Sequence, residues 1–345
     1  MTIMIDEINS QPKVLEKVLA ESKNGVRDLC REVKARNIGL IYIAARGTSD
    51  HAAVYAKYIL EIHAGIPVAF AAPSVITVYG GKPDLQNALV IGISQSGKAE
   101  DVLEVMRHAD RQGALVAAIT NYEDSPMAKE ASYHFNCMAG EEKSVAATKT
   151  FTAQMMIMAM IAAELSGGRK LMEQLETVPG KVGEFLADFG VPDRVVIKYK
   201  DMQECFILAR GTNYSIALEG ALKIQETCYV RAKAYAMSDF YHGPLALLDT
   251  SIPVFLIAPG GLAGEGNVEM AEVLAGYGIE TAAVTNDKGI MKMVSETIEV
   301  PSGLSDFTSP FVTAAAMQLF ACRLSLAKGL NPDNPRNIKK VTITR

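Results

Sequence analysis

The most constraining feature of this chain is a long internal repeat. The segment YIAARGTSDHAAVYA (Tyr42–Ala56) returns as FILARGTNYSIALE (Phe206–Glu219), and Arg46 and Arg210 begin the matching turns. A second pair, GALVAAITN from Gly113 and GIETAAVTN from Gly278, keeps almost the same spacing. This period is far longer than the units of about 20–50 residues that build solenoids, so the repeat predicts two copies of one domain.

Each copy alternates short β-branched runs with longer periodic ones, which indicates parallel strands joined by helices. We expect strands at Ile38–Ala45, Val68–Ala71, Ala88–Ile93, Leu115–Ile119 and Tyr133–Asn136, and again at Glu204–Ala209, Lys233–Ala236, Val254–Ile257 and Thr281–Val284. The predicted fold class is α/β, with two tandem doubly wound parallel-sheet domains of the flavodoxin-like kind. We place them at residues 1–190, which include an N-terminal helix and bridging helices, and at residues 191–345.

Four further segments outside the strands have distinct patterns. One amphipathic helix is expected from about Ile5 to Lys34, two helices broken near Gly167–Gly168 between Phe151 and Phe189, and another helix near Pro310–Ala327. The apolar run Met155–Ala163 is too short to span a bilayer and is interpreted as a buried helix. The tail after Gly329 has two prolines and little periodicity, so it must be held by the rest of the protein or move freely.

Composition restricts the classes of protein. With 49% hydrophobic and 21% charged residues the chain is an ordinary globular one, and its net charge of −5 gives no basic surface for nucleic acid. The five scattered cysteines favour reduced thiols in a cytoplasmic protein over a disulfide or zinc framework. The first residues lack a secretory signal pattern, and we expect no membrane partner.

The segment with the most chemical content is LVIGISQSGKAED, Leu89–Asp101. A buried strand runs into Ser94, Gln95, Ser96 and Gly97, and a helix is expected to begin near Lys98. Hydroxyls, an amide and free helix N–H groups then converge on one point, as binding of a phosphate monoester requires. The segment also satisfies GxxxxGK, but Ala99 stands where a magnesium-binding nucleotide loop needs Ser or Thr. A plain serine-capped turn is the alternative.

Six motifs in order resemble one known family. They are ARGTS (Ala45–Ser49), SQSGK (Ser94–Lys98), SVAATKTFTAQ (Ser144–Gln154), ALEGALKIQE (Ala217–Glu226), YHGPLAL (Tyr241–Leu247) and PRNIKK (Pro335–Lys340). Together they span nearly the whole chain, which resembles the double sugar-isomerase (SIS) domain of glucosamine-6-phosphate synthase and its free-standing relatives.

The resemblance implies a site for a sugar phosphate. It implies that Ser94, Gln95, Ser96 and Ser49 hold the phosphate with Thr48 nearby, and that Lys98, Val145 and Ala147 line the substrate. It also implies that Glu226 moves a proton between C1 and C2, that His242 helps to open the ring, and that Lys340 and Lys223 act near the carbonyl. In the synthase the histidine comes from a neighbouring subunit, so a homodimer with a shared active site is expected here. No metal or organic cofactor is expected.

Elementary chemistry agrees with these roles. A carboxylate can serve as a base, the ordinary pKa of histidine suits ring opening near neutral pH, and a lysine can form a Schiff base or stabilise an oxyanion. Lys223 and Glu226 are three residues apart, so they share a helix face with Glu219 one turn earlier. The alternatives are a surface ion-pair helix, a helix-capping His242 and an ordinary tail charge at Lys340. His51 could touch substrate or only lie on its helix.

The chain also departs from the synthase. Ala99 and Ala147 replace hydroxyl residues, and Lys98 replaces an acidic residue and could pair with phosphate as a point charge. Because this sequence carries no glutamine-hydrolysing domain, we expect the reverse chemistry, in which glucosamine-6-phosphate gives fructose-6-phosphate and ammonia. The ARGTSDHAA and EKSVAATKTFTAQ strings look most like free-standing glucosamine-6-phosphate deaminases. A fructosamine-6-phosphate deglycase, a phosphosugar isomerase and a non-catalytic sugar-phosphate sensor remain as alternatives.

Overall fold

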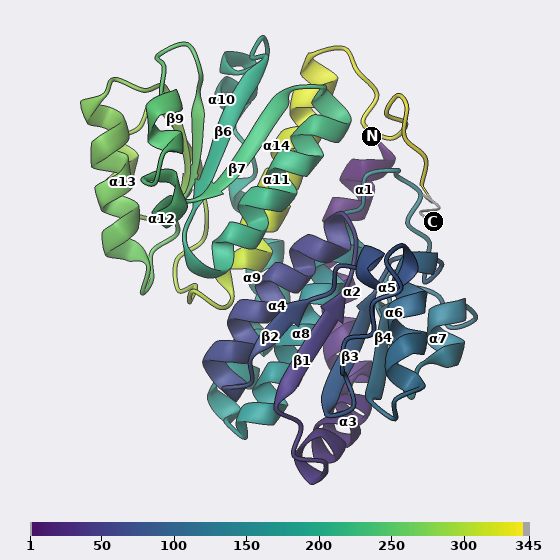
Figure 1. Cartoon of the computed structure of the whole chain (residues 1–345). Helices are drawn as coiled ribbons and strands as arrows, with labels where there is room; N and C mark the ends of the chain where they lie inside the picture. The colour runs from purple at the N-terminus through teal and green to yellow at the C-terminus, as the bar shows by residue number, and fades with distance from the viewer. Residues whose placement is uncertain (1, 341–345) are drawn as a thin grey trace. The chain divides into compact units, whose positions relative to one another are not determined.

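The computed structural model describes residues 2–340 and contains two parallel five-stranded sheets (Figure 1). The first sheet has the order β2-β1-β3-β4-β5, and the second has the order β10-β9-β8-β6-β7. Read from its β7 end, the second sheet repeats the topology of the first. The prediction of two doubly wound α/β domains related by a repeat is therefore confirmed.

The strands fall close to their predicted positions. The first sheet consists of β1 (Leu40–Ala44), β2 (Val68–Phe70), β3 (Ala88–Ile93), β4 (Leu115–Thr120) and β5 (Tyr133–Asn136). The second consists of β6 (Glu204–Ala209), β7 (Arg231–Ala236), β8 (Val254–Ile257), β9 (Thr281–Thr285) and β10 (Glu296–Glu299). The sequence prediction missed β10, a four-residue edge strand with a glutamate at each end and one fully buried side chain, Ile298.

Contacts divide the chain into two compact units built from separate segments. The first-copy unit comprises Lys13–Glu142, Lys149–Glu176 and, of the tail, Ile338–Lys340. The second-copy unit comprises Met1–Pro12, Lys143–Thr148 and Thr177–Asn337. Each unit takes a short piece of chain from outside its own repeat. The predicted boundary between residues 190 and 191 stays a prediction.

Helices cover both faces of each sheet. The first-copy unit has α2 (Gln11–Glu21), α3 (Lys23–Ala35), α4 (Thr48–Ala64), α5 (Ser74–Thr77), α6 (Glu100–Asp110), α7 (Pro126–Glu130), α8 (Lys149–Ser166) and the first half of α9 (Arg169–Glu184). The second-copy unit has α1 (Ile3–Asn9), a π-helical turn η1 (Phe185–Phe189), α10 (Asp193–Lys198), α11 (Tyr214–Cys228), α12 (Met237–Phe240), α13 (Gly264–Gly276) and α14 (Ser309–Ala327). Short 3₁₀ turns lie at η2 (Gly211–Asn213), η3 (Pro244–Leu247) and η4 (Ile290–Lys292).

Each sheet has an apolar core. In the first-copy unit, Val90 and Val116 of the central strands pack with Val102 and Met106 of α6. In the second-copy unit, Phe206 and Leu256 belong to a cluster with Phe240 and Leu274. Strands β3, β4, β8 and β9 are buried along their whole length, as expected for parallel strands covered on both faces.

The predicted single N-terminal helix from Ile5 to Lys34 is wrong, because this segment forms α1, α2 and α3. At the first break, the Ser10 hydroxyl donates to the Glu7 carbonyl oxygen, and Pro12 has no N–H to continue the ladder. The second break lies at Ser22, before Asn24 and Gly25, which have low helix propensity. The first break coincides with the change of unit after Pro12.

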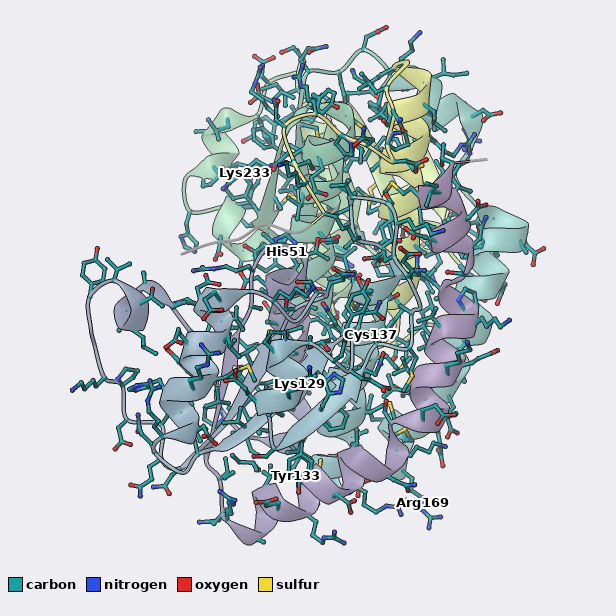
Figure 2. The ribbon with its side chains drawn as sticks, turned by 90° about the vertical axis from the view of Figure 1, so that its right-hand side faces the viewer. His51, Lys129, Tyr133, Cys137, Arg169 and Lys233 are labelled. Atoms are coloured by element: carbon teal, nitrogen blue, oxygen red, sulfur yellow. The ribbon has the colours of Figure 1, made fainter. Side chains whose placement is uncertain are left out.

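The long middle segment was predicted correctly. Residues Met155–Ala163 are buried within α8, which ends at Ser166, and α9 begins at Arg169 after the predicted break. Gly167 has φ +66°, a left-handed conformation that ends the helix at little cost for glycine. All five cysteines are buried and free, among them Cys137 (Figure 2). Burial raises the pKa of the Cys30 thiol to about 12.

The tail from Gly329 to Asn337 is held by the second-copy unit. The backbone N–H groups of Ile3 and Met4, at the start of α1, donate to the Asp333 carboxylate at 2.9 and 2.8 Å. The guanidinium of Arg336 lies 4.1 Å from the centre of the Tyr229 ring. Among residues 2–340, only α14 is long and apolar enough to cross a membrane by composition, and 78% of its apolar window is buried, as in a core helix.

Candidate active site

The site begins where β1 and β3 end side by side. These strands pair in parallel from Leu40 with Ala88 to Ala44 with Gly92, so their carboxyl ends meet at one edge of the sheet. After β1 the chain turns to β2 on one side, and after β3 it turns to β4 on the other. This change of direction is the topological switch point, where open α/β sheets place their ligands.

The loop after β3 has the geometry of an anion site. It runs from Ser94 to Ala99 before α6 begins at Glu100, two residues later than predicted. The Gly97 N–H donates to Ser94 Oγ at 3.2 Å, and the Lys98 N–H donates to Ser96 Oγ at 3.3 Å. Ser94 is buried, Gln95 and Ser96 are half-buried, and Lys98 is exposed. The loop thus gathers serine hydroxyls in front of an 11-residue helix, and in this structure those hydroxyls accept the N–H groups of Gly97 and Lys98.

The turn after β1 lies beside this loop. Gly47, with φ +55°, precedes α4, which starts with the half-buried Thr48 and the buried Ser49. His51 lies on the first turn of α4 (Figure 2), where its backbone N–H donates to the Gly47 carbonyl oxygen at 3.2 Å. Thr48, Ser49 and the Ser94–Lys98 loop are thus brought to one edge of the first sheet.

An ion pair that sequence reasoning missed links the two turns. Arg46 Nε donates to Asp101 Oδ2 at 2.7 Å, and the Asp101 side chain is only 4% exposed. Arg46 was noted only as a marker of the repeat, and nothing in the local sequence pairs it with a residue on α6. The pair holds the start of α6 against the turn after β1. It thereby also holds the Ser94–Ala99 loop, which leads into α6.

In the second copy, a side chain from the same copy accepts the N–H groups of the equivalent loop. The loop after β8 holds Gly260 and Gly261, and the N–H groups of Leu262 and Ala263 donate to the Asp306 carboxylate at 2.7 and 3.1 Å. A carboxylate of the chain therefore occupies these donors, whereas within residues 2–340 no carboxylate accepts from the N–H groups of the Ser94–Lys98 loop. This difference agrees with placing an anionic ligand in the first copy.

The predicted catalytic carboxylate belongs to a buried charge cluster on α11. Lys223 Nζ lies 2.6 Å from Glu226 Oε2 and 3.4 Å from Glu219 Oε1. The side chains of Lys223 and Glu219 are 0% and 1% exposed, while that of Glu226 is 22% exposed. The predicted shared helix face is confirmed, and the alternative of a surface ion-pair helix is wrong.

The cluster fixes the charge state of Lys223. Burial alone would lower the pKa of its ammonium group, but the negative charges of Glu219 and Glu226 outweigh burial and raise the pKa to about 12. Lys223 is therefore an ammonium ion at neutral pH. Its charge is paired with Glu226 at 2.6 Å, and an ammonium ion has no lone pair for nucleophilic attack.

The remaining predicted residues lie in three places. Val145 and Ala147 are half-buried in the Lys143–Thr148 segment, where the Glu7 carboxylate accepts the N–H groups of Lys143 and Ser144 at 2.6 and 3.3 Å. His242 is exposed in the turn after α12, and its backbone N–H donates to the Asp239 carbonyl oxygen.

Lys340 Nζ lies 3.0 Å from Glu142 Oε2, within the first-copy unit. The predicted residues therefore fall into two groups. Thr48, Ser49, the Ser94–Lys98 loop and Lys340 belong to the first-copy unit, and Lys223, Glu226, His242, Val145 and Ala147 to the second-copy unit. Their roles stay predictions.

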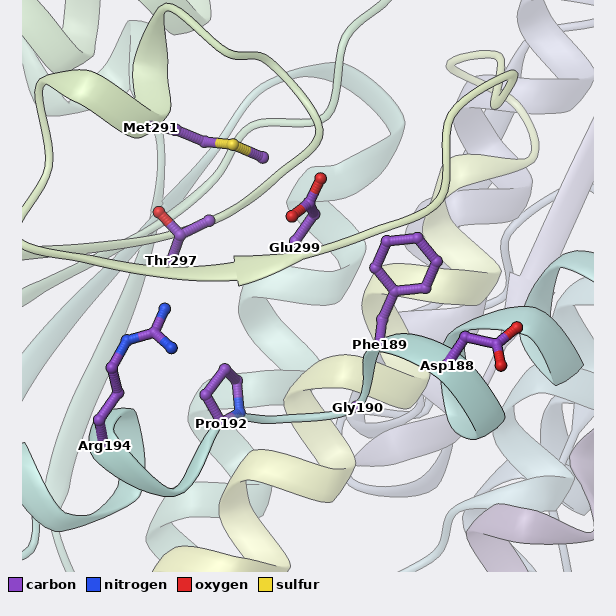
Figure 3. A pocket seen from close by; sticks show the side chains of 8 residues that line it. All are labelled: Asp188, Phe189, Gly190, Pro192, Arg194, Met291, Thr297 and Glu299. Carbon is purple, nitrogen blue, oxygen red and sulfur yellow. The ribbon is translucent and has the colours of Figure 1, made fainter.

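A separate pocket of about 400 Å³ opens in the second-copy unit (Figure 3). It lies between the π-helical turn, the start of α10 and strand β10, and Arg194, Met291 and Glu299 contribute to its lining. None of the predicted site residues lines it. Within residues 2–340, no three His, Cys, Asp or Glu side chains gather in a group that could hold a metal ion.

Comparisons with known proteins assign the family. The sequence matches the SIS domain over residues 35–164 and again over residues 198–327, one match for each copy. The chain belongs to the SIS domain family, as the motifs predicted. Within that family it resembles the phosphosugar isomerases and the isomerase half of glutamine–fructose-6-phosphate aminotransferase.

Three relatives illustrate this similarity. The isomerizing glutamine–fructose-6-phosphate aminotransferase of Aquifex aeolicus is 35% identical over 99% of this chain and 57% of its own length. The C-terminal domain of glucosamine-fructose-6-phosphate aminotransferase from Francisella tularensis has a TM-score of 0.86 at 28% identity, covering 97% of this chain and 98% of that domain. A proposed phosphosugar isomerase from Silicibacter pomeroyi has a TM-score of 0.88 at 30% identity, covering 96% and 100%. The chain spans little more than half the length of the curated relatives that it matches.

We expect Gly97→Ala to destabilise the first-copy unit. Gly97 has φ +63°, and a Cβ there would lie 2.2 Å from Ser125 Oγ and 2.5 Å from Ser125 Cβ. Gly113→Ala is the matched control, because Gly113 has φ +77° with no atom within 4 Å of a Cβ. The backbone penalty, about 1–2 kcal/mol, is common to both, so thermal unfolding should show a larger loss for Gly97→Ala. Equal losses would show that the loop can move away from Ser125.

We also expect Lys223→Met to lower stability strongly. It leaves the buried Glu219 without its counter-charge, and breaking a buried ion pair costs about 3–5 kcal/mol. Lys181→Met is the control, because Lys181 pairs with Glu184 at the same spacing but both side chains are partly exposed, so about 1 kcal/mol or less is expected. The free energy of unfolding from denaturant titration measures both changes. A small loss for Lys223→Met would mean that Glu219 accepts a proton or finds water at little cost.

Proposed function

We propose that this protein catalyses a deaminating aldose–ketose isomerisation, in which glucosamine-6-phosphate and water give fructose-6-phosphate and ammonia. The observation that carries the proposal is the buried Glu219–Lys223–Glu226 cluster, in which only Glu226 is partly exposed. A buried ion pair is costly, so a cluster that presents one carboxylate to solvent is better explained by chemistry than by stability. The relatives are glutamine–fructose-6-phosphate aminotransferases, and an aminotransferase that acts on fructose-6-phosphate supports the substrate class.

The phosphate end of the substrate is assigned to the first copy. Ser94, Gln95 and Ser96 would bind phosphate oxygens with the loop N–H groups, and Thr48 and Ser49 would add donors from the neighbouring turn. The dipole of α6 favours an anion at this position. Ala99 contributes no hydroxyl, and the exposed Lys98 supplies a positive charge beside the loop.

The proposed reaction has three steps. His242 helps proton transfer between the ring oxygen and the C1 hydroxyl, which opens the sugar to the aldehyde. Glu226 removes the proton from C2 and returns it to C1, while a second proton leaves the C2 nitrogen and one is added to the C1 oxygen, so that the C1 aldehyde becomes an alcohol and the C2 amine becomes an imine. Water then adds to C2, the C–N bond breaks, and ammonia leaves with the ketose. The positive charges of Lys223 and Lys340 stabilise negative charge that develops on oxygen during proton transfer.

Three alternatives share part of this chemistry. A fructosamine-6-phosphate deglycase and a phosphosugar isomerase without nitrogen would use the same ring opening and C1–C2 proton transfer. A sugar-phosphate sensor would keep the Ser94–Lys98 loop but would not need the α11 cluster. The three therefore differ in products and in their response to changes at Glu226.

We expect glucosamine-6-phosphate incubated with the purified protein to release ammonia and fructose-6-phosphate in equal amounts. Glu226→Gln should lower the rate by at least about 100-fold, because general base catalysis contributes on this scale, while phosphate binding persists. An enzymatic ammonia assay and a coupled ketose assay measure the products. Ser96→Ala is the companion variant and should act mainly on KM.

Other outcomes would redirect the assignment. Ketose formation without ammonia, from a sugar phosphate that lacks nitrogen, would indicate the isomerase. Release of an amine from a fructosamine-6-phosphate alone would indicate the deglycase. Sugar-phosphate binding that is abolished by Ser96→Ala and untouched by Glu226→Gln, with no turnover of any substrate, would indicate the sensor.

We also propose that the protein works as a homodimer in which His242 serves the partner's site. His242 is exposed within its own unit, which leaves it accessible to another chain. Co-expressed Glu226→Gln and His242→Ala chains should recover about a quarter of the wild-type rate, since half of the dimers are mixed and each has one intact site. Each variant alone should be nearly inactive. A mixture with no recovered activity would place His242 in the site of its own chain.

A further inference from the structure

We propose that Glu142 is the positioning residue for Lys340, and that it fixes the tail lysine on the unit that carries the phosphate loop. The inference rests on the proposed function, in which Lys340 acts near the substrate carbonyl. Glu142 begins the EKSVAATKTFTAQ string, but neither that string nor the six motifs assigned it a role. Its role follows from its burial, its hydrogen bonds and the unit to which Lys340 belongs.

Glu142 lies between β5 and α8 and is held rigidly. Its side chain is 0% exposed. The Thr150 backbone N–H donates to Oε1 at 3.2 Å, and the Thr150 hydroxyl donates to Oε2 at 2.9 Å. Thr150 is the second residue of α8, an 18-residue helix, so the carboxylate caps free N–H groups and lies at the positive end of the helix dipole.

The pairing with Lys340 satisfies the charge of a buried carboxylate. Lys340 Nζ donates to Glu142 Oε2 at 3.0 Å, and the Lys340 side chain is 24% exposed. A buried carboxylate needs a counter-charge as well as hydrogen bonds, and Lys340 supplies it. A lysine has a long, flexible side chain, so without such a partner its ammonium group would sample many positions.

The tail changes unit just before Lys340. Up to Asn337 it belongs to the second-copy unit, and residues Ile338–Lys340 belong to the first-copy unit. Glu142 therefore attaches Lys340 to the unit that contains the Ser94–Lys98 loop. An ammonium group stabilises a developing oxyanion only where it is held in advance at the right place. Glu142 contributes that placement without touching the substrate.

The test is a double-mutant cycle with Glu142→Gln, Lys340→Met and the double variant, using glucosamine-6-phosphate. Glutamine keeps an oxygen for Thr150 but removes the charge that holds Lys340. We expect Glu142→Gln to lower kcat by about 10- to 100-fold with little change in KM, because a small misplacement of a reacting group costs on this scale. In the Lys340→Met background the same change should have almost no effect on kcat.

Thr150→Val is the matched control. It removes one hydrogen bond to Glu142 but leaves the carboxylate and its pairing with Lys340, so kcat should stay close to that of the wild type. Thermal unfolding of all four variants shows whether any loss of kcat comes from unfolding of the protein. The proposal would be overturned if the fold-losses in kcat of Glu142→Gln and Lys340→Met simply multiplied in the double variant, because Glu142 would then act independently of Lys340.

A second readout does not depend on activity. The protein is acetylated briefly at fixed pH, and the remaining lysines are then acetylated completely with an isotopically heavy reagent. Cleavage at arginine leaves Lys339 and Lys340 on one peptide. The light-to-heavy ratio at each lysine then compares the labelling of Lys340 with that of the exposed Lys339. Glu142→Gln should raise the Lys340 to Lys339 ratio severalfold, and Thr150→Val should not. An unchanged ratio would overturn the anchoring role. A raised ratio in a protein that turns over no sugar phosphate would support the anchor and reject the proposed reaction.

Discussion

The position of strand β1 beside β3 is the constraint on which the rest of the molecule depends. Because the chain leaves these parallel strands in opposite directions, the turns that follow them diverge at their carboxyl ends, which is where open α/β sheets bind ligands. Thr48 and Ser94 belong to these two turns, and the Arg46–Asp101 ion pair links the first turn to α6. The second sheet has the same arrangement at β6 and β8, so the repeat duplicates the scaffold of a ligand site.

Two buried carboxylates connect segments that are distant in the sequence. The side chains of Asp101 and Glu142 are at most 4% exposed, and they are paired with Arg46 and Lys340. Asp306 is paired with backbone donors instead. An unpaired buried charge has a much higher free energy than a paired one. Each carboxylate therefore favours the one arrangement of the chain in which its partners are in place. These contacts explain how irregular loops and a tail, which share few apolar contacts, are held in defined places.

Much of the fold could be predicted because its signals are local. The β-branched runs located nine of the ten described strands, and the three-residue spacing of Lys223 and Glu226 predicted their shared face. The contacts of Arg46 with Asp101 and of Glu142 with Lys340 could not be predicted, because they join residues 55 and 198 positions apart. The division of the N-terminal helix was missed for a related reason. Its apolar period continues through Ser10 and Pro12, although the hydrogen bonding at these residues ends the helix.

The two lysines in the predicted site therefore have different physical roles. Lys223 is enclosed between two carboxylates on one helix, and its raised pKa of about 12 removes it from covalent chemistry near neutral pH. Lys340 is partly exposed, and its carboxylate partner Glu142 lies in another segment of the chain. A partly exposed ammonium group can meet a substrate oxygen without first breaking a buried cluster. In the proposed reaction, Lys340 is thus better placed than Lys223 to approach the carbonyl, and Lys223 would set the position and charge environment of Glu226.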